Sequence, residues 1–231
     1  NGLQQDIGAA YIFGRNQSGI DNWGEVARLR GNPSGQNDNF GGSVAISGPW
    51  ALVGADRNDI KGVDAGAVFA FYKNQNGVVD SWGQRNILLD LNGKAGDHYG
   101  SGVALDGEYA VVGARGDDDH FGDDSGVGLV YLNQDNGWVL VGELEDGGGQ
   151  SGDALGSCVA LDGRTAILGA PLDDAPGSDA GSVLVYGGLC NDAQRPAVRN
   201  ALADESGTSV RCFPVPFSDV LNIEVNGMQS V

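Results

Sequence analysis

Three short patterns recur along the chain at the same two spacings, 59 and then 56 residues. They are a tryptophan (Trp23, Trp82, Trp138), an aromatic residue or leucine before glycine (Phe40-Gly41, Tyr99-Gly100, Leu155-Gly156) and Gly-Ala (Gly54-Ala55, Gly113-Ala114, Gly169-Ala170). Independent patterns that share one period are the mark of a repeat architecture. The chain is therefore predicted to consist of tandem units of just under 60 residues, with one short deletion.

Each unit has the pattern of four short strands. The first, at 42–47, alternates apolar and small residues and ends at a tight turn. The second, at 50–55, is a continuous apolar run, which predicts burial on both faces. The third lies at 67–72, and the fourth begins at the repeated tryptophan. Further copies are predicted from Trp23 onward and at 9–13, 102–106, 109–114, 128–132, 138–144, 157–162, 165–170 and 182–186, which makes 13 strands in all.

Four antiparallel strands repeated radially are typical of β-propeller blades. A two-sheet β-sandwich is the alternative, but a sandwich does not require so regular a repeat. Propellers close with about four to eight blades, and about three are visible in this sequence. The predicted fold class is all-β: a β-propeller fragment of about three four-stranded blades at 1–187, followed by a linker and a partial β segment.

The composition excludes several classes of function. The 231 residues carry a net charge of −18, which argues against a nucleic-acid partner because such partners need a basic surface. No apolar run approaches the ~18 residues of a membrane helix, so membrane insertion is not expected. The acids are 25 Asp and only 6 Glu, and Asp favours turns and cation sites over helices.

Residues 6–187 resemble FG-GAP repeats. The resemblance rests on Phe-Gly-Gly-Ser-Val-Ala at 40–45 with Val-Gly-Ala at 53–55, on Tyr-Gly-Ser-Gly-Val-Ala at 99–104, and on Leu-Gly-Ser at 155–157 with Gly-Ala-Pro at 169–171. Such repeats form the propellers of integrin α chains and of many secreted bacterial proteins. The resemblance implies an extracellular or cell-surface protein that binds a protein or glycan ligand, serves in adhesion and often holds calcium.

One departure from the integrin pattern concerns calcium. The integrin-type calcium loop joins the FG strand to the GAP strand, and here that connection is only a tight turn such as Asp106-Gly107 or Asp162-Gly163. The chain resembles the shorter bacterial variant, so the integrin ligands do not carry over.

An acidic loop follows each Gly-Ala pair instead. Clustered carboxylate and amide oxygens are the ligands that calcium prefers, whereas the alternative is that Asp and Gly simply form polar turns there. The second loop is the strongest candidate, because its five carboxylates would repel one another without a cation. The predicted calcium ligands are Asp56, Asn58, Asp59 and Asp64 in the first loop, Asp117, Asp118, Asp119, Asp123 and Asp124 in the second, and Asp173, Asp174, Ser178 and Asp179 in the third.

The C-terminal part loses the repeat. Residues 188–209 have the composition of a linker, and 210–231 resemble the start of a type IX secretion C-terminal sorting domain, truncated, with Val215 where the family usually has Asn. This resemblance implies an interaction with the outer-membrane secretion machinery and export. A disulfide between Cys190 and Cys212 is an open possibility in an exported protein.

The remaining residues point to no chemistry of their own. His98 and His120 are expected to be solvated, and no convergent partners predict a catalytic site, so the protein is expected not to be an enzyme. Arg115-Gly116-Asp117 spells an integrin-binding tripeptide, but so short a match in an Asp- and Gly-rich chain is interpreted as drift. Two other functions stay open: an accessory propeller of a larger secreted hydrolase, and a structural spacer.

Five further side chains carry structural predictions. The three recurring tryptophans are expected to pack between blades, because they appear in every unit. Trp50 does not recur and is the better candidate for a surface role. Cys158 lies in an alternating strand and is expected to be buried and inert.

Overall fold

The computed structural model describes residues 7–74, 77–78, 80–119, 121–134, 137–174, 177–189 and 208–212, the last five by their backbone alone. All 13 predicted strands are present in four antiparallel sheets, and the described residues contain no α-helix. The strands are β1 (Ala10–Arg15), β2 (Trp23–Leu29), β3 (Ser43–Ser47), β4 (Trp50–Ala55), β5 (Ala67–Lys73), β6 (Trp82–Leu88), β7 (Tyr99–Asp106), β8 (Tyr109–Ala114), β9 (Val127–Gln134), β10 (Gly137–Asp146), β11 (Cys158–Asp162), β12 (Thr165–Ala170) and β13 (Ser182–Tyr186).

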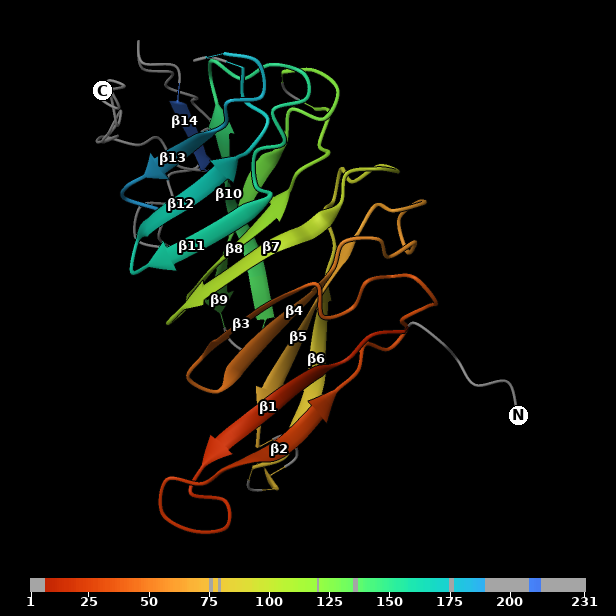
Figure 1. Ribbon diagram of the computed structural model, residues 1–231, viewed down its shortest axis with the longest axis vertical. Coiled ribbons are helices and arrows are strands. Elements are labelled where there is room, and N and C mark those ends of the chain that lie inside the picture. The colour runs from red at the N-terminus through yellow and green to blue at the C-terminus, as the bar shows by residue number, and fades with distance from the viewer. Residues whose placement is uncertain are drawn as a thin grey trace.

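Each sheet is a meander whose strands follow chain order, and we call each sheet a blade. The first blade is β1-β2, the second β3-β4-β5-β6, the third β7-β8-β9-β10 and the fourth β11-β12-β13. Figure 1 shows the blades following one another along the long axis of the molecule. This propeller-like arrangement confirms the predicted fold class and excludes the two-sheet sandwich.

A fourteenth strand, β14 (Thr208–Cys212), pairs antiparallel with β10 and extends the third blade to five strands. It begins inside the range predicted as a linker. Residues 190–207 and 213–231, which hold most of the predicted linker and sorting segment, lie outside the described part of the chain, as do Cys190 and the side chain of Cys212. The division into domains and the proposed disulfide therefore stay predictions.

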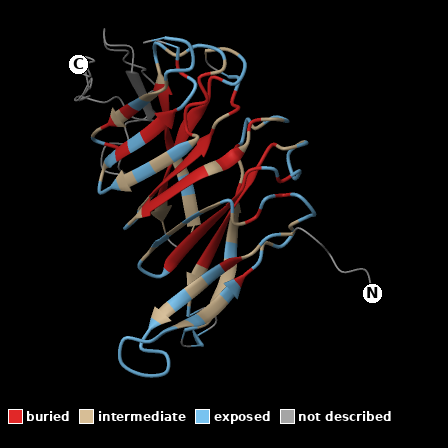
Figure 2. Cartoon of the chain, viewed as in Figure 1, coloured by how far each residue is buried: buried red, intermediate tan, exposed pale blue. Residues whose placement is uncertain are grey.

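The apolar cores lie between consecutive blades. β3 and β4 pack against β7, and β7 and β8 pack against β11. The predicted burial of the second strand on both faces is confirmed in the second blade, where β4 is buried along its whole length. In the fourth blade β12 alternates between buried and exposed residues, and Ile167 is 41% exposed, because no further blade covers it in the described chain (Figure 2).

The Gly-Ala and aromatic-Gly patterns mark the places where the backbones of two blades meet. A Cβ atom on Gly54 would lie 2.3 Å from the carbonyl oxygen of Gly100, and one on Gly113 would lie 1.9 Å from that of Gly156. Only glycine permits such an approach, since any side chain would force the two backbones apart. The repeat spacing in the sequence is therefore the spacing of these contacts.

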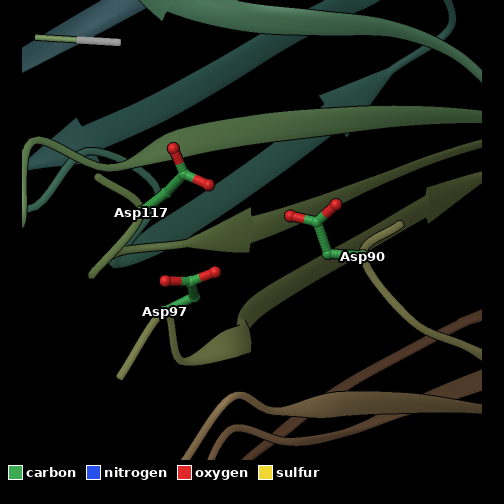
Figure 3. A group of neighbouring side chains, drawn as sticks. All are labelled: Asp90, Asp97 and Asp117. Atoms are coloured by element: carbon green, nitrogen blue, oxygen red, sulfur yellow. The ribbon is translucent and has the colours of Figure 1, made fainter. Parts of the chain in front are cut away.

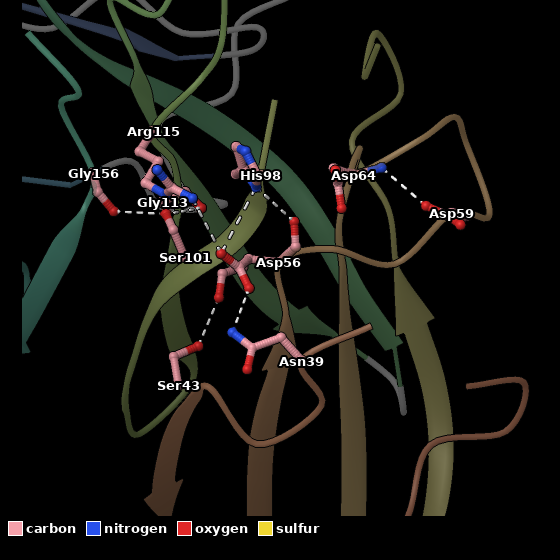
Figure 4. A network of polar contacts seen from close by, with 11 residues as sticks. Asn39, Ser43, Asp56, Asp59, Asp64, His98, Ser101, Gly113, Arg115 and Gly156 are labelled. Carbon is pink, nitrogen blue, oxygen red and sulfur yellow. Dashed lines mark hydrogen bonds and ion pairs between the residues drawn. The ribbon is translucent and has the colours of Figure 1, made fainter. Parts of the chain in front are cut away.

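Serine hydroxyls reinforce the same contacts. The Ser43 hydroxyl donates to the carbonyl oxygen of Gly100 at 2.7 Å, and the Ser101 hydroxyl donates to that of Gly156 at 3.0 Å (Figure 4). Each bond runs from one blade to the next, and it satisfies a carbonyl group whose burial would otherwise be costly.

The tryptophans only partly follow the prediction. Trp138 meets Trp50 of the preceding blade edge to face at 5.5 Å between ring centroids, and Trp82 packs on the apolar core between the first and second blades. Trp23 is 64% exposed, so its predicted place between blades is wrong. Its two counterparts face the preceding blade, and in the described chain no blade precedes the first.

Two side chains are placed opposite to the prediction. Trp50 is buried, not a surface residue, because it turns into the interface of the second and third blades, where it contacts Tyr72 as well as Trp138. Cys158 is exposed, not buried. It occupies the position of Ser43, whose hydroxyl reaches the following blade, and beyond Cys158 the described chain provides no such blade.

We expect Gly113→Ala to lower the free energy of unfolding by about 2–3 kcal/mol, because the added methyl group collides with the backbone of the fourth blade. Urea denaturation followed by circular dichroism measures the change. Gly148→Ala is the matched control, since its Cβ would meet only the side chain of Asp146 at 3.5 Å. Equal stability of the two variants would contradict the close-contact argument.

Candidate metal centre

The loops on one edge of the blades form a continuous rim. The connection after β4 runs beside the segment that enters β7, with hydrogen bonds from the His98 amide to the Asp64 carbonyl (3.1 Å) and from the Tyr99 amide to the Ala65 carbonyl (2.9 Å). The connection after β8 meets the segment that enters β11 in the same way. The loops that follow Gly54-Ala55 and Gly113-Ala114 are therefore each held by the chain that enters the next blade.

Six of the predicted calcium ligands close these loops on themselves. A carboxylate oxygen near the start of each loop accepts a hydrogen bond from a backbone amide near its end, at 2.7–2.9 Å. The residue whose amide donates has a left-handed backbone conformation, which short polar residues adopt more readily than others. The pairs are Asp59 with Asp64, Asp118 with Asp124, and Asp174 with Asp179.

A buried group of three carboxylates lies under the rim between the second and third blades. Asp90 follows β6, Asp97 precedes β7, and Asp117 follows β8. One oxygen from each lies within 4.8 Å of the others, and the residues are 7%, 2% and 3% exposed. Figure 3 shows the three carboxylates directed toward a common centre. We call this group the Asp triad; the sequence predicted Asp117 as a ligand, but not Asp90 or Asp97.

Backbone amides hold each member of the triad in place. Asp97 Oδ2 accepts from the Lys94 amide at 2.6 Å, Asp90 Oδ1 from the Asn92 amide at 3.0 Å, and Asp117 Oδ1 from the Asp119 amide at 3.0 Å. The second oxygen of Asp97, Oδ1, is buried and has no hydrogen-bond partner among the described residues.

Burial sets the acidity of the triad. Desolvation, together with the nearby charges of Asp117 and Asp90, raises the pKa of Asp97 from 3.8 to about 6. The pKa of Asp90 is raised as well, again chiefly by desolvation, with Asp117 adding to it. Three buried carboxylates without a cation are thus electrostatically unfavourable at neutral pH.

Other predicted ligands lie away from the triad. Asp56 accepts from the Asn39 amide group at 2.7 Å and pairs with Arg115 at 3.5 Å, as Figure 4 shows. His98 contacts the Asp56 carbonyl through Nδ1 at 3.1 Å, and its side chain is 21% exposed, so it is not simply solvated as predicted. Asp119 forms an ion pair with Lys94. Asp123 and Ser178 are exposed on the rim, and His120 lies outside the described residues.

The Arg115-Gly116-Asp117 tripeptide is not presented to solvent as a ligand would require. Asp117 is 3% exposed, and Arg115 is engaged with Asp56 of the second blade.

A periodic signal in the sequence could have identified the missing members. Aspartate precedes each aromatic-Gly or Leu-Gly pair by two residues, at Asp38, Asp97 and Asp153, with the same spacings of 59 and 56 as the other markers. All three are at least 95% buried. Position by position, the triad corresponds to Gly31, Asp38 and Asn58 one repeat earlier, and to Asp146, Asp153 and Asp173 one repeat later.

A comparison with protein families identifies the family of the repeat units. The FG-GAP repeat model matches residues 23–71, 82–132 and 138–186. The chain belongs to the FG-GAP repeat family. Each match starts at the repeated tryptophan and ends in the third strand of the next blade, so one FG-GAP repeat contains a complete set of triad positions. No curated protein matches the chain significantly. In the described residues, no helix is long and apolar enough to cross a membrane.

The pKa of Asp97 predicts a pH dependence of stability in the presence of a chelator. Between about pH 4 and pH 7 the folded chain retains a proton that the unfolded chain has released, so the free energy of unfolding falls as the pH rises. We expect this decrease in the free energy of unfolding to be smaller by about 2 kcal/mol in Asp97→Asn than in the wild type. Urea titrations of both proteins at pH 4.5 and pH 7.5 measure it, and a difference between the proteins that does not change with pH would contradict it.

Proposed function

We propose that this FG-GAP protein is a non-enzymatic binding or adhesion module, extracellular or displayed on a cell surface, whose rim recognises a protein or glycan ligand. Family membership supports the extracellular setting, since such repeats are typical of secreted and surface proteins. Calcium that stiffens the rim is part of the proposal. Export by the type IX route is also part of it and rests on the sequence of 210–231.

An exposed apolar patch on the rim is the observation that carries the binding role. Ile60, Val63 and Leu91 are 42%, 69% and 76% exposed, in loops otherwise rich in Asp and Gly. Hydrogen bonds from Lys61 to the Leu91 carbonyl (3.2 Å) and from the Gly96 amide to the Val63 carbonyl (3.0 Å) hold the two loops side by side. The three side chains thus belong to one surface, which we call the rim patch.

The fold itself does not require this patch. One repeat later, Asp119 stands at the position of Ile60 and Gly147 at the position of Leu91. The same loop architecture therefore forms with polar or absent side chains at these positions. Exposed apolar groups that a fold does not need are typical of contact sites for a partner.

We expect the triple variant Ile60→Ser, Val63→Ser, Leu91→Ser to lose at least about tenfold in affinity for its surface ligand, because the apolar contact area is removed. Labelled protein on a glycan array and on intact cells measures binding, and the melting temperature checks that the fold is kept.

Ile20→Ser is the matched control, since Ile20 is 93% exposed in the turn between β1 and β2, at the opposite ends of the strands from the rim. Binding that survives the triple variant, or that Ile20→Ser reduces equally, would contradict the assignment to the rim patch.

A further inference from the structure

We propose that Asp90, Asp97 and Asp117 bind one calcium ion that joins the second blade to the third. This site differs from the acidic loops predicted from the sequence, because only Asp117 comes from such a loop. It also lies elsewhere than the turn between the first and second strands, where the integrin-type site would be. It deepens the calcium part of the proposed function without depending on the ligand of the rim.

The geometry of the triad fits calcium. Calcium binds oxygen at about 2.3–2.6 Å, so two ligands on opposite sides of the ion lie up to about 5 Å apart. The three carboxylate oxygens are within 4.8 Å of one another without any rearrangement. All three donors are carboxylates, which favours calcium over zinc, a metal that usually takes Cys or His ligands. Their burial disfavours magnesium, which usually retains several water ligands.

An unpartnered oxygen supplies independent evidence for a ligand. Asp97 is 2% exposed, and its Oδ1 has no hydrogen-bond partner in the described structure. A buried polar atom without a partner is costly, and a buried charge is more costly still. Asp97 belongs to the close group that Asp90 and Asp117 complete, so a cation at its centre would satisfy this oxygen and offset the three charges.

The junction between the first and second blades contains the same positions in a form that needs no cation. There the amide group of Asn58 donates to Asp38 Oδ2 at 2.6 Å, and Gly31 stands at the position of Asp90. The Asp38 carboxylate thus has a hydrogen-bond donor from the protein itself, the Asn58 amide group. At the junction between the second and third blades the amide has become a carboxylate and the glycine an aspartate, so the site changes from one acid to three.

The junction between the third and fourth blades provides an internal comparison. Asp146, Asp153 and Asp173 repeat the three acids, and burial raises the pKa of Asp146 and Asp153. Among the described residues, however, only the triad between the second and third blades brings its oxygens within 4.8 Å and leaves one of them buried and unpartnered. The proposed calcium site is therefore specific to the junction between the second and third blades.

Calcium titration of the chelator-treated full chain tests the proposal. We expect isothermal titration calorimetry to give one calcium ion per chain. Because a ligand that binds only the folded state stabilises it, the melting temperature should rise by about 5–10 °C at a calcium concentration one hundred times Kd. Magnesium at the same concentration should give a smaller rise. No binding heat together with no rise in melting temperature would overturn the proposal.

Variants separate the triad from the other acids. Asp117→Asn copies Asn58, so this protein should fold in chelator with a melting temperature at or above that of the wild type in chelator, and calcium should not change it. Asp97→Asn should also abolish calcium binding. Asp153→Asn, the same substitution one repeat later, should leave it intact.

Calcium binding of unchanged stoichiometry in both Asp97→Asn and Asp117→Asn would overturn the proposal, as would its loss in Asp153→Asn. Ligand binding by the rim patch is measured separately on arrays and cells, so failure of the calcium site and failure of the proposed function are distinguishable.

Discussion

The close backbone contact between consecutive blades is the constraint on which the rest of the structure depends. Gly54 meets Gly100, and Gly113 meets Gly156, at distances that leave no room for a Cβ atom. Because these contacts fix how near and in what register two blades lie, they also fix where the connecting loops run. The parallel bridges from Gly66 to Tyr99 and from Gly126 to Leu155 continue the same register into the rim.

This constraint explains why the fold could be predicted from the sequence. The patterns that recur are those that the contacts between blades require, and strands such as β4, β8, β12 and β13 begin and end at the predicted residues. The wrong predictions concern side chains whose burial depends on which face of a strand is covered by a neighbouring blade. Periodicity shows that Cys158 alternates with apolar residues, but not whether a following blade covers it.

The candidate metal centre was only partly predictable for a different reason. Clusters of acids within one loop are visible in the sequence, whereas Asp90 and Asp117 are separated by 27 residues and belong to different blades. Most loop acids proved to have local partners, as Asp118 does with the Asp124 amide. The locally bonded acids Asp59, Asp118 and Asp174 are exposed, whereas the triad is buried. The sequence signals Asp97 only through its recurrence at the repeat spacing.

The position of the triad between two blades has a mechanical consequence. Asp90 is tied to the last strand of one sheet, and Asp117 to the second strand of the next, so a force that pulls the sheets apart acts directly across the triad. Apolar packing between sheets can give way gradually at one end, whereas an ion held by carboxylates from both sides must be released in one step. For a protein under load, such a clamp would determine the tension at which neighbouring repeats separate.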